Sequence, residues 1–431
     1  MFLKLYRNIL RRSDLVLEAY LNRRLKKGKE DPKRFDERKG IASRERPPGL
    51  LIWIHAASVG EAQSALILIK ALNEQIGAEN FSVLVTSVTR TSAGLMAERL
   101  PDNAYHQFAP VDHPDWLRRF FDHWQPDIAF CIESELWPNT LRFLRKRHIP
   151  SALINARMSK TSYKRWKLVG DDAKKMLSSF DIILTQTEEH EEWFENLGAH
   201  SVITTDNLKY SAKPLPVDEK ELKKTQKALK GRPVWVYAST HDGEESLACE
   251  THINLKKKFP DIATIIVPRH PERRSEIEDT VSKYNLPYQL RSVKPDMATK
   301  TEIYIADTMG ELGLFYTLSD IAVIGRTFSN DGGGGHNPME AALLDAVPIT
   351  GPNYQNQTQL VRDMLDGDAI LVADNKAHLL EIILSLLQSS DKMTDKKQKA
   401  LDFAAQKANV IDHVMEEIEP LFLKKGLHFK K

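Results

Sequence analysis

The chain has 431 residues, which exceeds the size of one ordinary hydrophobic core and indicates two domains. Hydrophobic residues make up 42% and charged residues 28%, a balance typical of a folded globular protein rather than a disordered or fully membrane-embedded one. The two cysteines, Cys131 and Cys249, lie far apart, so the sequence offers neither a disulfide framework nor a CxxC metal motif.

The first 48 residues form a basic leader, with 15 Lys and Arg against 7 Asp and Glu, whereas the rest of the chain is net negative. Apolar residues recur at helical spacing from Phe2 to Tyr20, and no apolar stretch is long enough to cross a bilayer. Such a helix can lie in the interface of an anionic membrane, or it can dock on the protein's own core, and the leader alone favours the two equally. A nucleic-acid tail is less favoured, because aromatic and basic residues do not interleave.

From about residue 50, short apolar runs alternate with amphipathic helical patterns such as 61–75 and 114–123. This alternation predicts a doubly wound α/β fold, in which helices cover both faces of a parallel sheet. The predicted strands of this half are 51–55, 81–87, 127–132, 151–154 and 181–185.

The stretch 206–219 contains Pro214 and Pro216 and lacks an apolar period, so it reads as a linker. The alternation then restarts, and it ends in helices predicted at 377–388 and 395–422. The predicted strands of the second half are 234–238, 263–268, 302–306, 321–325, 347–350 and 369–373.

Two Rossmann-like domains therefore follow each other, and we expect them to face each other across a cleft. The predicted segments are the leader (1–48), a first α/β domain (49–210), a linker (211–219), a second α/β domain (220–390) and C-terminal helices (391–431). Ligands of such sheets bind at the carboxyl ends of strands, so the loops after the strands are where chemistry is expected.

Four consecutive glycines, 332–335, follow a predicted strand and lead into His336, Asn337 and Pro338. Asn337 fits a helix N-cap, Pro338 the first helical position, and Glu340 the third residue of a capping box. Free backbone N–H groups at a helix N-terminus bind anions without a metal, so the turn predicts a phosphate site. The alternative is a mobile surface loop, which the Asn-Pro-x-Glu continuation makes less favoured.

Three other loops of the second half also follow strands and carry polar or glycine residues that suit a nucleoside phosphate. In the first of them, Asp242 and Glu245 are predicted to form a capping box. The candidates are Ser239, Thr240 and His241, then Arg269 and His270, then Gly310 and Glu311.

In the first half, Ser58 and Glu61 lie where the first strand opens into a helix. A carboxylate there can act as general base for an acceptor hydroxyl, although a helix-start Glu is more often only a cap. Two more acids, Glu133 and Glu135, follow a later strand, and Arg157 follows the next. Polar residues at successive strand ends predict one acceptor-binding wall. No histidine or aspartate spacing fits a metal site, so we expect no catalytic metal.

Together these motifs resemble the 3-deoxy-D-manno-octulosonic acid (Kdo) transferases that act on lipid A, which are inverting glycosyltransferases with a GT-B fold. The resemblance covers about residues 30–390. It rests on 55–61, 133–139, 155–159, 207–209, 239–245, 267–273, 307–312 and 334–340.

The resemblance implies transfer of Kdo from CMP-Kdo to a lipid A precursor (lipid IVA), on the cytoplasmic face of the inner membrane and without a cofactor or metal. Glu61 would be the base, with Ser58, Glu133, Glu135 and Arg157 at the acceptor. The expected donor residues are Lys209, Ser239, Thr240, His241, Arg269, His270, Gly310, Glu311, Gly334, Gly335, His336, Asn337, Glu340 and Asn356.

The chain departs from the family pattern at a few positions. Asp206 stands where a Gly usually precedes Asn-x-Lys, and Arg326 replaces a small residue after Gly325. Two alternatives remain open. A nucleotide-sugar epimerase shares the two-domain fold, but the basic leader argues against it. An inactive membrane-associated binding protein would retain the nucleotide pocket, but the intact Glu61 argues against that.

Overall fold

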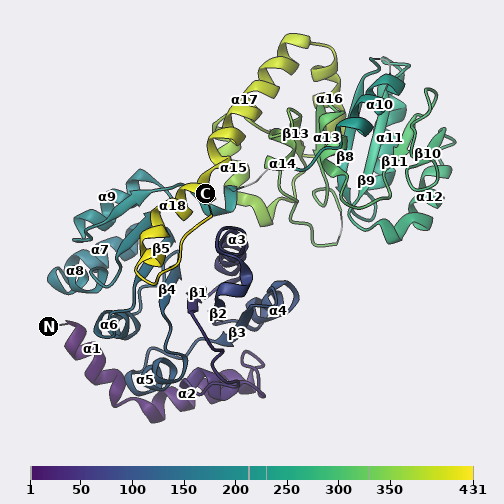
Figure 1. The fold of residues 1–431 in the computed structure, drawn as a ribbon. Coiled ribbons are helices and arrows are strands. Elements are labelled where there is room, and N and C mark those ends of the chain that lie inside the picture. Colours follow the sequence, from purple (N-terminus) through teal and green to yellow (C-terminus); the bar gives the residue numbers. More distant parts are fainter. Residues whose placement is uncertain (1, 212–213, 230, 330, 431) are drawn as a thin grey trace. The chain divides into compact units, whose positions relative to one another are not determined.

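The computed structural model describes residues 2–211, 214–229, 231–329 and 331–430. The chain forms two compact units: unit 1 comprises Met1–Ser211 and Asn409–Lys431, and unit 2 comprises Ala212–Ala408. Each unit contains a seven-stranded sheet whose neighbouring strands all run parallel (Figure 1). The predicted pair of doubly wound α/β sheets is thereby confirmed. Residues 212 and 213 of the predicted linker lie outside the described residues.

The sheet of unit 1 has the strand order β3-β2-β1-β4-β5-β6-β7. Its central strands are buried on both faces, which explains their uninterrupted apolar runs. The strands are β1 (Leu51–His55), β2 (Ser82–Ser87), β3 (Ala104–Phe108), β4 (Ile128–Ile132), β5 (Ser151–Ala156), β6 (Ile182–Thr185) and β7 (Val202–Thr204). The helices are α1 (Phe2–Arg11), α2 (Asp14–Lys26), α3 (Val59–Ile76), α4 (Arg90–Arg99), α5 (Pro114–Trp124), α6 (Pro138–Lys146), α7 (Lys160–Leu168), α8 (Asp171–Leu177), α9 (Glu188–Asn196) and α18 (Val410–Leu423), with short 3₁₀ turns at η1 (Phe35–Lys39), η2 (Ala78–Asn80) and η3 (Leu208–Tyr210).

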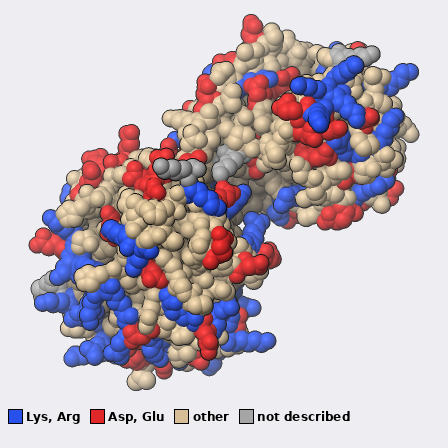
Figure 2. All heavy atoms as spheres, viewed as in Figure 1, with Lys and Arg blue, Asp and Glu red and all other residues tan. Residues whose placement is uncertain are grey.

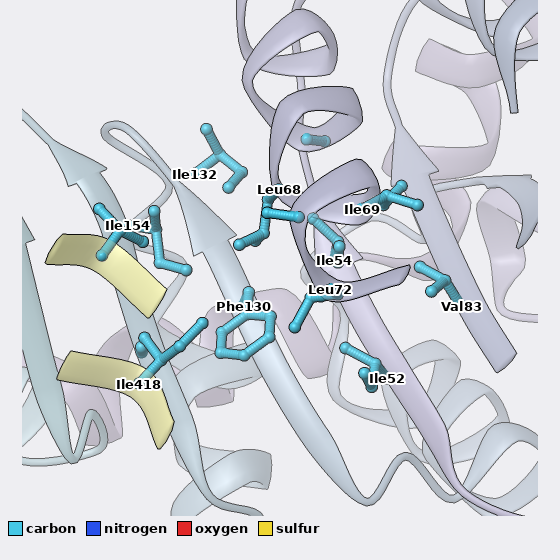
Figure 3. Packing of buried hydrophobic residues seen from close by; sticks show 14 of the residues in the cluster. Ile52, Ile54, Leu68, Ile69, Leu72, Val83, Phe130, Ile132, Ile154 and Ile418 are labelled. Carbon is cyan, nitrogen blue, oxygen red and sulfur yellow. The ribbon is translucent and has the colours of Figure 1, made fainter. Parts of the chain in front are cut away.

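The core on one face of this sheet joins segments from both ends of the chain. Leu68 and Leu72 of α3 pack with Ile54 of β1, and Ile418 of α18 packs near Phe130 of β4 (Figure 3). Burying each such side chain contributes about 1.5–3 kcal/mol, so this face holds α3 and the strand ends that precede it in fixed positions.

The sheet of unit 2 has the strand order β10-β11-β9-β8-β12-β13-β14. The strands are β8 (Val234–Thr240), β9 (Ala263–Pro268), β10 (Tyr288–Leu290), β11 (Ile303–Ile305), β12 (Ile321–Ile324), β13 (Val347–Thr350) and β14 (Leu371–Val372). The helices are α10 (Glu219–Leu229), α11 (Glu244–Lys256), α12 (Arg274–Ser282), α13 (Leu312–Thr317), α14 (Met339–Ala342), α15 (Thr358–Asp366), α16 (Lys376–Leu387) and α17 (Ser390–Ala408), with 3₁₀ turns at η4 (Pro271–Arg273) and η5 (Gln355–Gln357).

The last forty residues do not form one long helix. The helix predicted over 395–422 is divided at Asn409 into α17, which belongs to unit 2, and α18, which belongs to unit 1. The two parts bury different side chains: Ala400 and Ala404 of α17 are buried in unit 2, whereas Val414 and Ile418 of α18 join the core of unit 1. The predicted C-terminal segment 391–431 is therefore shared between the two units.

The leader folds as the helices α1 and α2 and docks on unit 1, where the Tyr6 hydroxyl donates to Asp112 Oδ2 at 3.1 Å. Its outward side keeps apolar residues in solvent, with Leu5 56%, Leu15 82% and Val16 70% exposed. Among the described residues, no helix is long and apolar enough to cross a membrane.

Candidate functional site

Each sheet places several of the predicted site residues where its strand order reverses. In unit 1 this point lies between β1 and β4, and in unit 2 it lies between β8 and β12. Crevices that bind ligands form at such switch points, outside the carboxyl ends of the strands. The loops that follow these four strands carry Glu61, Glu133 and Glu135 in unit 1, and His241 and the glycine turn in unit 2.

Glu61 lies in the first turn of α3, directly after β1. Ser58 caps this helix by accepting a hydrogen bond from the Glu61 backbone at 3.3 Å. In return, the Ser58 hydroxyl donates to Glu61 Oε1 at 3.1 Å, and the Ala57 backbone donates to Oε2 at 2.5 Å. The carboxylate is therefore held in one orientation by its own helix start, as a capping box holds its Glu.

Glu61 is only 6% exposed. Burial raises the pKa of its carboxyl group, and the negative charge of Glu135 raises it further, while the hydrogen bond from Ala57 works in the opposite direction. A carboxylate whose pKa is moved toward neutral pH is a stronger base than an exposed one, so the site favours proton acceptance by Glu61.

Glu135 lies after β4 and is held differently. Its Oε2 lies 3.1 Å from His55 Nε2, and the Trp137 indole donates to the same oxygen. His55 Nδ1 in turn lies 2.9 Å from the Thr86 hydroxyl, which fixes the ring. Burial raises the pKa of Glu135, but the hydrogen bonds from His55 and Trp137 and the charge of His55 outweigh it, so the pKa lies below its ordinary value. Neighbouring carboxyl groups whose pKa values move apart are typical of catalytic sites.

Glu133 is the third carboxylate at the carboxyl ends of the strands of unit 1. It is fully buried, and it pairs with Lys209 Nζ at 2.6 Å and with Arg157 Nε at 2.7 Å. Its backbone is left-handed, with φ of 60°, and that of Asn155 is similar at 58°. Asn155 Oδ1 accepts from the Leu208 backbone at 2.9 Å and so positions the short turn η3 that carries Lys209.

Lys209 is predicted to bind the nucleotide, but the structure also pairs it with a carboxylate of unit 1. Its ammonium group is paired with Glu133 in unit 1 and lies over the backbone of Gly60, where an added Cβ would meet Nζ at 3.2 Å. Asp206, which stands where a family Gly is expected, has φ of 67°. Aspartate tolerates this conformation better than most residues, so the substitution keeps the turn.

In unit 2, cationic and imidazole groups converge from several strand ends. His241 follows β8, Arg269 and His270 follow β9, and His336 follows the glycine turn. His241 Nε2 lies 3.2 Å from His336 Nε2, and the His270 ring packs edge-on against that of His241. Burial lowers the pKa of His336 to about 4, and the charges of His241, Arg269 and other cations contribute to the shift. Arg269 supplies a positive charge and the imidazole groups supply N–H donors, so the cluster suits an anionic ligand.

Two further residues, which the sequence analysis did not single out as site residues, complete this cluster. Asp331 Oδ2 lies 3.2 Å from both His241 Nδ1 and Arg326 Nε. Burial raises the pKa of Asp331, but hydrogen bonds from Ser329 and Gly333 and the charges of Arg326 and His241 bring it to about 2. Arg326 has φ of 62°, which explains why a small residue is expected there. Only its place directly after a strand could have indicated it.

The glycine turn differs from its prediction in one respect. All four glycines have positive φ, as a tight anion-binding turn requires, but three of their N–H groups already have acceptors. Gly333 donates to Asp331 Oδ1 at 3.1 Å, Gly334 to the Asn353 carbonyl at 3.2 Å and Gly335 to the Arg326 carbonyl at 3.1 Å. The expectation of free backbone donors is therefore wrong for Gly333, Gly334 and Gly335, because Asp331 and the carbonyls after β12 and β13 already accept their hydrogen bonds.

The helix after the turn, α14, is also shorter than expected, with only four residues, so its dipole is a weak source of anion affinity. Asn337 Oδ1 accepts from the Met339 backbone at 3.0 Å, but the predicted cap is wrong by one residue, because Pro338 and not Asn337 stands at the N-cap and α14 shows no side-chain cap. Asn356 packs against Gly334, where an added Cβ would lie 2.1 Å from Nδ2. Burial raises the pKa of Glu340, whereas the nearby charge of Arg269 lowers it. The predicted residues 334–340, Arg269 and Asn356 are thus brought together.

Other predicted residues already have internal partners. The capping box predicted for Asp242 and Glu245 is wrong, because α11 begins one residue later than that box requires, after Gly243, and shows no side-chain cap. Glu245 instead accepts from the Thr240 hydroxyl at 2.8 Å and from Arg273 at 3.1 Å. The adjacent Glu244 also has a structural role, accepting from several loop backbones after β12.

Gly310 and Glu311 follow β11. Glu311 forms a bidentate ion pair with the buried Arg291 and accepts from the Thr308 hydroxyl. Both residues line a cavity shared with Pro216 and Asp218, which His241 and the glycine turn do not line. Their predicted role in donor binding stays a prediction. Within the described ranges, no three His, Cys, Asp or Glu side chains are grouped so that they could hold a metal ion.

Comparison with known proteins points in one direction. Residues 33–212 match the family described as 3-Deoxy-D-manno-octulosonic-acid transferase (kdotransferase). A 3-deoxy-D-manno-octulosonic acid transferase of Rickettsia bellii is 33% identical over 401 residues, which is 93% of this chain and 94% of the relative. The enzyme of that name from Haemophilus influenzae is 31% identical, over 81% of this chain and 82% of its own length.

Two solved structures from Acinetobacter baumannii are also similar. MurG is 12% identical, with a TM-score of 0.50, and the match covers 86% of this chain and 100% of MurG, which places the chain in the same two-domain fold. The C-terminal CMP-Kdo binding domain of WaaA is 31% identical, with a TM-score of 0.41, over 44% of this chain and 97% of that domain.

Proposed function

Because the chain belongs to the 3-deoxy-D-manno-octulosonic acid transferase family, we propose that it transfers Kdo from CMP-Kdo to a lipid A precursor (lipid IVA) during lipopolysaccharide core biosynthesis. Membership makes the chain a glycosyltransferase of GT-B fold that transfers Kdo. The finer statements, namely the acceptor, the inverting course and the location, are our proposal. The family also gives reason to prefer transfer over the epimerase alternative.

The observation that carries the proposed mechanism is the buried Glu61 beside Glu135. In this mechanism, Glu61 accepts the proton of the acceptor hydroxyl as its oxygen bonds to the anomeric carbon of Kdo. The bond between that carbon and the phosphate oxygen breaks at the same time, and CMP leaves with the electron pair. Attack on the face opposite the leaving group inverts the anomeric centre. Glu135 remains ionised beside His55, and its negative charge helps to keep the pKa of Glu61 raised.

Unit 2 is proposed to hold the donor. The phosphate and the sugar carboxylate of CMP-Kdo are both anions, and His241, His270, His336 and Arg269 provide cationic or hydrogen-bonding groups for them. Fixed donors of this kind stabilise the charge that develops on a leaving phosphate, so this chemistry needs no metal ion. Asn356 and Glu340, close to the glycine turn, are proposed to contact the nucleoside.

Unit 1 is proposed to hold the acceptor, with Ser58, Glu133, Glu135 and Arg157 around the reacting hydroxyl. The acceptor is a lipid, so the enzyme must work at a membrane surface, and we propose the cytoplasmic face of the inner membrane. The surplus of positive charge in the first 48 residues and the exposed Leu15 and Val16 support a peripheral contact made by the leader.

The proposal is tested by incubating the purified protein with CMP-Kdo and the lipid A precursor. CMP should be released only when both substrates are present, and mass analysis should show the lipid heavier by Kdo. Release of CMP without any change in the mass of the lipid would refute the proposed acceptor. An unchanged pool of CMP-Kdo in every mixture would refute the proposed donor.

A further inference from the structure

We propose that a basic pocket between α1, α6 and α8 of unit 1 binds the phosphate monoester of a membrane lipid headgroup. The pocket has a volume of about 190 Å³ and lies apart from the residues assigned to transfer. Its lining comes from three elements that are distant in sequence, so only the fold assembles it. It is lined by Leu3, Lys4, Arg7, Pro138, Asn139, Arg142, Arg145, Asp172, Lys175, Met176 and Ser179.

The charge of this lining is strongly one-sided. Five of its residues are Lys or Arg, and Asp172 is its single carboxylate. Asp172 Oδ2 accepts from the Leu3 backbone at 3.4 Å, so this carboxylate helps to hold α1 in place. Within 2–211, none of the five cations forms an ion pair with a carboxylate, although ion pairs are common elsewhere on this unit. The cations therefore lack an anionic partner, which a doubly charged phosphate would provide.

Two further observations concern the charge of the pocket and a polar group in its lining that has no partner. Burial lowers the pKa of the Arg142 guanidinium, and the charges of Arg7 and Arg145 lower it further, so the three side chains share one field. Ser179 lines the same pocket and is 6% exposed, and its buried hydroxyl has no hydrogen-bond partner among the described residues. A phosphate oxygen accepts hydrogen bonds from both guanidinium and hydroxyl groups.

The source of the phosphate follows from what surrounds the pocket. Lys4 and Arg7 line it from α1, while Leu5 and Ile9 on the other side of that helix are 56% and 55% exposed. Figure 2 shows Lys and Arg gathered over the part of unit 1 where α1, α6 and α8 lie. A helix that places apolar residues in the acyl boundary brings its basic residues to the level of lipid headgroups. A lipid-borne phosphate thus reaches the pocket at high local concentration, which a free phosphate ion does not.

This inference rests on the proposed function, in which the enzyme acts at a membrane surface. Its test measures vesicle binding without a sugar donor, so it does not depend on transfer. The full-length protein is mixed with phosphatidylcholine vesicles that contain either phosphatidic acid, a monoester, or phosphatidylglycerol, a diester, adjusted to equal surface potential. We expect the wild-type protein to bind the phosphatidic acid vesicles about tenfold more tightly. The double variant Arg7→Gln/Arg142→Gln should lose this preference.

The matched control is Arg12→Gln/Arg23→Gln, which removes two exposed leader arginines that do not line the pocket. It should weaken binding to both vesicles equally and keep the preference. If the pocket variant unfolds, as thermal melting would show, the exposed Lys175→Gln variant takes its place.

Equal binding of the wild-type protein to both vesicles overturns the proposal, as does an equal loss of preference in the control variant. Inorganic phosphate serves as the soluble probe. If it binds the pocket as tightly as the vesicles do, the ligand is a free ion and the lipid source is wrong. CMP release, measured separately, reports on the proposed transfer, so the two failures can be told apart.

Discussion

The Nζ atom of Lys209 lies 2.6 Å from Oε1 of Glu133, and this pair ties the last turn of the first sheet domain to the loop after β4. Glu133 is 1% exposed, and its carboxylate is paired with two cationic side chains. Arg157 is its other partner, but that side chain is 55% exposed. Lys209 is therefore the more shielded of the two contacts.

We expect Lys209→Met to lower the free energy of unfolding by about 1–3 kcal/mol, because it leaves a buried carboxylate with one exposed partner. Urea denaturation measures the change. The matched double variant Glu133→Gln/Lys209→Met removes both charges and should recover part of the loss. If the single and double variants are equally destabilised, the pair does not stabilise the fold in the way its geometry indicates.

A second prediction concerns Glu61. Replacing it by Gln keeps its shape but removes the base, so kcat should fall by about 10²–10⁴-fold while CMP-Kdo still binds. Ser58→Ala, which removes one hydrogen bond to the same carboxylate, should reduce kcat much less. Equal kcat values for wild type and Glu61→Gln would show that the base lies elsewhere.

The raised pKa of Glu61 also predicts how stability and activity change with pH. Burial, followed by the charge of Glu135, raises the pKa of Glu61, so folding favours its protonated form. This contribution to stability is present below the ordinary pKa of 4.5 and is lost as the pH rises through the raised value. Relative to wild type, Glu61→Gln should therefore be more stable at neutral pH than at pH 4. Wild-type kcat, measured at saturating CMP-Kdo, should rise with pH through the same range, because the base must be ionised.

The central strands and the start of α3 could be predicted from the sequence, because their signals are local. Strand β1 is an unbroken apolar run, and the spacing of Ser58 and Glu61 predicts the start of a helix. The strands β3, β7 and β10 were missed, since edge strands are short or half-exposed and lack such a run. The division at Asn409 was missed as well, because α17 and α18 each continue a helical pattern.

The candidate site was predictable in its residues but not in its contacts. The Lys209–Glu133 pair spans 76 positions, and no local pattern indicates such a partner. The glycine turn has the composition of an anion site, but only the fold shows that the Arg326 and Asn353 carbonyls already accept its N–H groups. Composition predicts where a loop can bend, whereas hydrogen-bond partners depend on elements that the fold brings together.

The glycine turn itself can be tested with two alanine substitutions. Gly334 has φ of 122°, and a Cβ there would lie 2.1 Å from the Asn356 amide nitrogen. Gly332 has φ of 93° and open space around it. In both variants the positive φ costs about 1–2 kcal/mol of folding free energy, but only Gly334→Ala must also displace Asn356. We expect Gly334→Ala to weaken CMP-Kdo binding well beyond Gly332→Ala, as measured by calorimetry. Equal affinities would show that Asn356 does not contact the donor.

The last prediction links donor binding to protons through His336. Burial, the charge of His241 and nearby arginines lower the pKa of this imidazole to about 4, so it is neutral in the free enzyme at pH 7. An anionic donor beside it raises that pKa again, and binding must then take up protons. We expect CMP-Kdo affinity to increase as the pH falls from about 6.5 toward 4, and calorimetry in buffers of different ionisation enthalpy to show proton uptake. His336→Gln cannot take up this proton and should show a flatter dependence. If wild type and His336→Gln have the same pH profile, the donor's anionic groups lie away from His336.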